Sequence, residues 1–131
     1  MNDVKMRILG APQRYVQGPG AIGRLAEEVA IAGGGPVAIV IDPVARALIG
    51  ETVVAQLPGA ALLDFGGECT ASEIAARAAE LGDARLVIGI GGGKAIDTAK
   101  GAAIAADLPV MIVPTIASND SPTSHIAVIY T

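Results

Sequence analysis

The chain has 131 residues, of which 52% are hydrophobic and only 2% aromatic, so a single domain can bury a core of Ala, Val, Ile and Leu. Thirteen acidic residues against nine basic ones, without a basic tract, argue against nucleic acid as a partner. The lone Cys69 excludes an internal disulfide and favours a reducing cytoplasm, and no apolar run is long enough to predict a membrane span.

Apolar runs alternate with helical patterns from the beginning of the chain. A short strand over residues 14–18 and a helix over residues 21–33 come first. The continuous β-branched run at residues 37–41 predicts a strand that is buried on both faces. Asp42 as the N-cap, followed by proline at the first helical position, predicts a helix over residues 43–57.

The middle of the chain repeats this alternation. Residues 60–65 are apolar enough to form a second long strand. Thr70 and Glu73 have the spacing of a capping box at the start of the next helix, and Gly82 is expected to end that helix. The apolar run at residues 85–90 predicts the strand that follows.

The last third begins with three glycines that open a helix to about Ala106. A strand over residues 109–114, a hydroxyl-rich loop over 115–124 and a strand over 126–131 complete the pattern. The βα alternation predicts a Rossmann-like α/β fold, a mostly parallel sheet flanked by helices, as one domain over residues 1–131. Because a strand-like segment ends flush with Thr131, we expect a chain cut from a longer one, with a natural edge strand as the alternative.

The glycine turn is the main candidate for chemistry. Gly91, Gly92 and Gly93 follow a strand at the carboxyl edge of the predicted sheet, where ligands of such sheets bind. Glycines allow close approach of the backbone, the helix N-terminus offers free N–H groups, and Lys94 adds a full positive charge. These features suit a phosphate or pyrophosphate. The alternative is a tight turn alone, with Asp97 in a surface ion-pair ladder to neighbouring lysines.

Two common phosphate motifs do not fit this turn. The P-loop requires Ser or Thr after Gly-Lys and a glycine where Ile88 stands, but Ala95 follows Lys94. The dinucleotide fingerprint fits at Gly89 and Gly91, but Lys94 occupies the third glycine position. The best ribose-binding acid, Asp42, precedes the turn instead of following it. The sequence therefore predicts a phosphate-binding turn of a lineage other than these two motifs.

Three stretches resemble one known family. "GGECTASE", "GIGGGKAIDTAKG" and "VPTIASNDSPTS…VIYT" are similar to the glycerol dehydrogenases, within the metal-dependent, iron-containing type of alcohol dehydrogenases. The likeness runs from about Tyr15 to Thr131. It implies the N-terminal NAD-binding domain of a two-domain enzyme, without its helical C-terminal metal domain. The family's metal ligands, one Asp and two His, would lie beyond Thr131, and His125 matches none of them.

The resemblance also assigns roles to individual residues. Asp42 matches the acid at the adenosine ribose, which favours NAD over NADP, although its N-cap role is an equally open reading. Asp120 matches the residue that faces the nicotinamide and the substrate, with an Asx turn as the alternative. The implied cofactor-binding positions are Asp42, Gly92, Gly93, Lys94, Thr115, Ser118, Ser124, Ile126 and Tyr130.

Several of these positions have a plainer reading. Ile126 also fits a core position, and Tyr130 fits an amphipathic ring at a domain edge. Asn119 and His125 depart from the family pattern, which puts the exact polyol preference in doubt. Cys69 has no base or metal partner in sight, and we expect a buried or half-buried thiol.

The implied activity is the oxidation of glycerol to dihydroxyacetone with NAD and a divalent metal, expected to be zinc, in a homo-oligomer at full length. We expect the 131-residue chain alone to have no turnover. Three alternatives stay open. They are a catalytically silent NAD-binding module, a relative acting on a phosphorylated polyol, and an interaction domain whose glycines only turn the chain.

Overall fold

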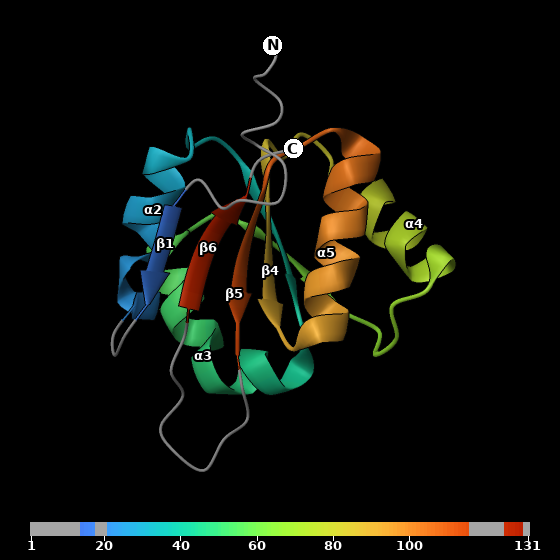
Figure 1. Ribbon diagram of the computed structural model, residues 1–131, viewed down its shortest axis with the longest axis horizontal. Coiled ribbons are helices and arrows are strands. Elements are labelled where there is room, and N and C mark those ends of the chain that lie inside the picture. The colour runs from blue at the N-terminus through green and yellow to red at the C-terminus, as the bar shows by residue number, and fades with distance from the viewer. Residues whose placement is uncertain (1–13, 18–20, 116–124, 130–131) are drawn as a thin grey trace.

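A computed structural model describes residues 14–17, 21–115 and 125–129 of the chain (Figure 1). The elements follow one another as β-strands and helices in near-regular alternation. They are β1 (Arg14–Gln17), the 3-10 turn η1 (Ala21–Arg24), α2 (Leu25–Ile31), β2 (Val37–Ile41), α3 (Pro43–Gln56), β3 (Ala61–Asp64), α4 (Ala71–Ala79), β4 (Leu86–Gly91), α5 (Gly93–Ala106), β5 (Val110–Pro114) and β6 (His125–Ile129).

The strands form one sheet in the order β1-β6-β5-β4-β2-β3. The four strands from β5 to β3 are parallel to one another, whereas β6 is antiparallel to both β5 and β1. The predicted α/β fold with a mostly parallel sheet is therefore confirmed. The predicted final strand exists as well, and its antiparallel direction was not foreseen.

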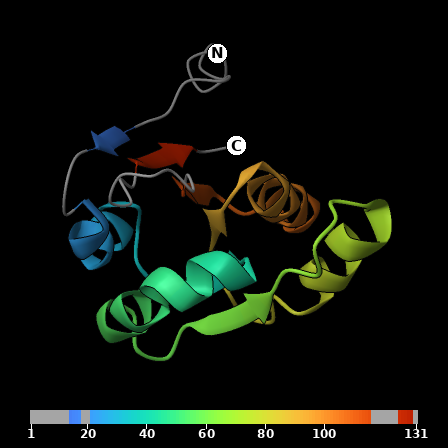
Figure 2. The ribbon, with the colours of Figure 1, turned by 90° about the horizontal axis from the view of Figure 1, so that it is seen from below.

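Helices cover both faces of this sheet (Figure 2). Alternate residues of each buried strand point to opposite sides, so that one strand contributes to two cores. Ile39 of β2 packs with α2 and α3, whereas Val40 packs with α5 and the end of α4. All five residues of β2 and all six of β4 are buried, as the continuous apolar runs predict for central parallel strands.

Helix α5 packs on β4 in the middle of the sheet, where small residues face each other. A Cβ atom added to Gly89 of β4 would lie 2.6 Å from Cβ of Ala99 on α5. On the other side of the helix, a Cβ atom at Gly101 would lie 2.8 Å from Cδ1 of Ile74 on α4. Glycine at these two positions therefore allows α5 to pack closely between β4 and α4.

Two local expectations are wrong. Helix α4 ends at Ala79, three residues before Gly82, because the chain turns there to bury Leu81 in the core. Gly82 does adopt a left-handed φ of 57°, but in the turn that leads to β4. Cys69 is exposed, contrary to the expected buried or half-buried thiol, because the segment between β3 and α4 runs over the surface.

No helix among the described residues combines the length and the hydropathy that a bilayer crossing requires.

Candidate functional site

The carboxyl ends of three neighbouring parallel strands meet at the glycine turn. Asp42 follows β2, Gly91 ends β4, and Thr115 follows β5. The Thr115 amide donates a hydrogen bond of 2.9 Å to the Gly91 carbonyl, and the Asp42 amide donates one of 3.2 Å to the Ile90 carbonyl. The structure therefore brings together five of the residues predicted for the site, namely Asp42, Gly92, Gly93, Lys94 and Thr115.

Gly91 is the residue that shapes this turn. Its φ of 144° is in the region that favours glycine. An added Cβ would lie 2.3 Å from Oδ2 of Asp42 and 3.2 Å from Cβ of Ala95. Gly91 was predicted as part of the turn but not as a separate site residue. The glycine triplet signals the turn without showing which of its three positions requires glycine.

The Asp42 carboxylate connects two turns that are 50 residues apart. Its Oδ1 accepts a hydrogen bond of 2.7 Å from the Ala45 amide, which confirms its predicted role as N-cap of α3. Its Oδ2 accepts a hydrogen bond of 3.1 Å from the Gly92 amide. A carboxylate has about four lone-pair positions, so each oxygen keeps acceptor capacity for a further donor.

The first turn of α5 offers amides to a ligand. The Gly92 amide is directed to Asp42, and Gly92 provides no side-chain cap for the helix. The amides of Gly93, Lys94 and Ala95 have no partner within the helix, as in any first turn. A Cβ added to Gly92 or Gly93 would meet no atom of the described residues within 4 Å. Open space therefore lies beside the positive end of a 14-residue helix.

Lys94 pairs with an acid that the sequence did not point to. Its Nζ donates to Oε1 and Oε2 of Glu68 at 3.1 and 3.0 Å, and both side chains are well exposed. In the structure Lys94 therefore pairs with Glu68, whereas the alternative of a surface ion-pair ladder paired it with Asp97. Glu68 lies inside one of the stretches that resemble the family. Its contact with Lys94 spans 26 residues, so no local sequence pattern predicts it.

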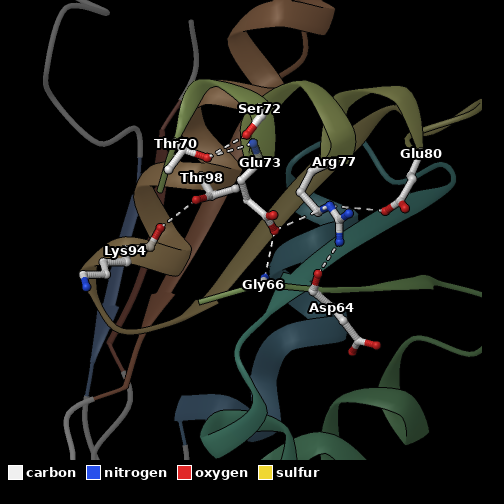
Figure 3. Close-up of polar contacts among 9 residues, drawn as sticks. All are labelled: Asp64, Gly66, Thr70, Ser72, Glu73, Arg77, Glu80, Lys94 and Thr98. Carbon is white, nitrogen blue, oxygen red and sulfur yellow. Dashed lines mark hydrogen bonds and ion pairs between the residues drawn. The ribbon is translucent and has the colours of Figure 1, made fainter. Parts of the chain in front are cut away.

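Polar contacts hold the segment between β3 and α4 against α4 (Figure 3). Glu68 lies in this segment. Thr70 Oγ1 accepts the Glu73 amide at 3.1 Å, which is one half of the predicted capping box. The Glu73 carboxylate does not return to Thr70 but accepts the Gly66 amide at 2.8 Å. The Arg77 guanidinium donates to the Asp64 carbonyl and lies 3.4 Å from the Glu80 carboxylate. Both ends of the segment between β3 and α4 are thus fastened to α4.

The remaining predicted residues stay predictions. Ser118, Asp120, Ser124 and Tyr130 lie outside the described residues. Ile126 belongs to β6, where its backbone lies opposite Val16 of β1. Among the described residues, no group of three or more His, Cys, Asp or Glu side chains is arranged to hold a metal ion.

Two hollows on the described surface lie away from the turn. One of about 260 Å³ lies between the ends of α2 and α3, and another of about 410 Å³ lies along α3 beside β3. Both are lined mainly by apolar residues and include no residue predicted for the site. The first-turn amides, which have no partner within α5, and the neighbouring lysine, not concavity, therefore identify the turn as the candidate site.

Comparison with known proteins gives a consistent answer over nearly the whole chain. The family described as "Iron-containing alcohol dehydrogenase" matches residues 12–131. A glycerol dehydrogenase of Thermotoga maritima is 42% identical over 123 residues, which are 92% of this chain and 34% of that protein. A glycerol dehydrogenase of Escherichia coli is 39% identical over 95% of this chain and 35% of its own length. The chain thus spans about a third of these relatives.

Solved structures agree. A probable glycerol dehydrogenase from Sinorhizobium meliloti superposes with a TM-score of 0.66 at 35% identity, over 79% of this chain and 29% of that one. The glycerol dehydrogenase of Schizosaccharomyces pombe gives a TM-score of 0.68 at 26% identity, over 86% of this chain and 33% of that one.

Proposed function

The chain belongs to the iron-containing alcohol dehydrogenase family, and we propose that it supplies the NAD-binding part of a glycerol dehydrogenase. The turn from Gly91 to Lys94 is the observation that carries the proposal. It combines helix amides without a partner among the described residues, open space and a lysine at the carboxyl edge of a parallel sheet. Relatives named glycerol dehydrogenase supply the substrate class.

The residues at the turn fit the pyrophosphate and the ribose of an adenosine diphosphate group. The amides of Gly93, Lys94 and Ala95 would donate to the pyrophosphate, and Lys94 would add a charge-assisted hydrogen bond. Asp42 would accept the ribose hydroxyls through its free lone pairs. Its negative charge would repel a 2′-phosphate, which favours NAD over NADP.

Orientation is the contribution of this chain to the reaction. When bound, NAD supplies the hydride acceptor, the nicotinamide carbon. Asp42 and the α5 amides would fix the adenosine diphosphate end, while Thr115 lies at the end of β5, directly beside the turn. Holding the acceptor in one place lowers the entropic part of the barrier. The described residues do not form a metal site.

Lys94→Met gives a direct test of the proposal. We expect the 131-residue chain to bind NADH saturably, and the variant to bind about tenfold more weakly because one charge-assisted hydrogen bond to the pyrophosphate is lost. NADH fluorescence titration measures both. Lys100→Met, the same change at the lysine six residues further along α5, is the matched control and should bind as wild type does.

The proposal fails if wild-type chain shows no saturable binding at millimolar NADH. It also fails if the Lys94 and Lys100 variants bind equally well.

A further inference from the structure

Lys94 is already engaged by a protein anion in the structure. Glu68 contacts the ammonium through both carboxylate oxygens, at 3.1 and 3.0 Å. This is the same kind of charge-assisted contact that a phosphate oxygen would make. The lysine therefore has two candidate anionic partners, and one of them is part of the chain.

The fold brings Glu68 to this position through a chain of specific contacts. Gly66, two residues before Glu68, is bound to the Glu73 carboxylate, and Thr70, two residues after it, caps α4. Helix α4 packs against α5 where Ile74 meets Gly101. Glu68 thus lies in a short segment that is bound to α4 on both sides, and Lys94 lies in the first turn of α5, the helix against which α4 packs.

We propose that Glu68 is an internal competitor for the ligand of the turn, which holds Lys94 in the empty site and must release it when the ligand binds. The inference rests on the proposed function, because it takes the ligand to be the pyrophosphate of a dinucleotide. Glu68 then sets the affinity in two ways. The ligand has to displace the carboxylate from Lys94, and the displaced carboxylate stays close enough to repel the bound phosphates.

The expected effect is modest because both side chains are well exposed, 63% for Lys94 and 70% for Glu68. Exposed ion pairs are weak, so the Glu68→Gln variant should bind NADH about three- to fivefold more tightly than wild type. The advantage should shrink as salt is raised, because screening weakens the competing pair and the repulsion alike.

Titrations of four proteins and one control variant distinguish competition by Glu68 from a direct contact with the ligand and from no role in binding. NADH titrations compare wild type, Glu68→Gln, the Lys94→Met variant, and Lys94→Met combined with Glu68→Gln. Glu51→Gln makes the same charge change on the exposed face of α3 and serves as the matched control. Competition predicts tighter binding for Glu68→Gln alone, a smaller gain in the Lys94→Met background, and no change for Glu51→Gln.

Two results of these titrations overturn the inference. One is weaker binding by Glu68→Gln, which would make Glu68 a direct contact of the ligand. The other is equal binding by Glu68→Gln and wild type.

A second probe keeps the inference testable if NADH does not bind at all, in which case the proposed function fails by itself. Inorganic pyrophosphate is titrated while the Lys94 Cε resonance is followed by NMR. Competition predicts that the resonance shifts at a lower pyrophosphate concentration in Glu68→Gln than in wild type. Equal midpoints, or no shift in either protein, overturn the competition.

Discussion

The Gly91→Ala variant is expected to be less stable than wild type by about 3 kcal/mol in its free energy of unfolding. Two causes add together. An alanine is strained at a φ of 144°, and its Cβ would be placed 2.3 Å from Oδ2 of Asp42. The Asp42 carboxylate would have to move, and it would lose its hydrogen bond to the Gly92 amide. Urea unfolding, with comparison of midpoints and slopes, measures the change.

Gly93→Ala is the matched control for this variant. A Cβ atom at Gly93 meets nothing within 4 Å, and the position begins the helix. Alanine favours the helix over glycine by up to about 1 kcal/mol, so this variant should be as stable as wild type or slightly more stable. If the two variants unfold at the same midpoint, the described geometry of Gly91 is wrong.

The Asp42→Ala variant is expected to lose about 2 kcal/mol of stability and to lose preference for NADH over NADPH. It removes the cap on the Ala45 amide and the bond to the Gly92 amide together. It also removes the negative charge that would repel a 2′-phosphate. Urea unfolding gives the stability, and NADH and NADPH titrations give the preference.

The Asp42→Ser variant separates the effect on stability from the effect on cofactor preference. Serine caps helices well, so this variant should recover about 1 kcal/mol relative to Asp42→Ala. Without a carboxylate it should still have lost the preference for NADH. A serine variant that discriminates against NADPH as wild type does would contradict the ribose role of Asp42 and leave only the cap.

Local sequence signals predicted most of the fold. The β-branched run of β2 and the Asp-Pro start of α3 depend on neighbours within a few residues, and the structure confirms both. The antiparallel direction of β6 shows only in its pairing with β5 and β1 in the assembled sheet. The early end of α4 depends on the burial of Leu81, which outweighs the glycine signal at Gly82.

Some features of the candidate site could likewise be predicted from short sequence patterns, and others could not. The glycine turn and Asp42 as an N-cap follow from short patterns, and the family resemblance joined them into one hypothesis. The bond between Asp42 and Gly92 and the pair between Glu68 and Lys94 span 50 and 26 residues. Such contacts exist only once the strands are side by side, so they were found in the structure and not in the sequence.

The proposed function requires the first turn of α5 to present its amides to the pyrophosphate of a dinucleotide. The most direct test is a titration of ¹⁵N-labelled chain with NAD⁺, followed through the backbone amide resonances. We expect the largest shifts at Gly93, Lys94 and Ala95. Saturation with NAD⁺ that leaves these three resonances in place, or that shifts mainly amides outside the turn, would contradict it.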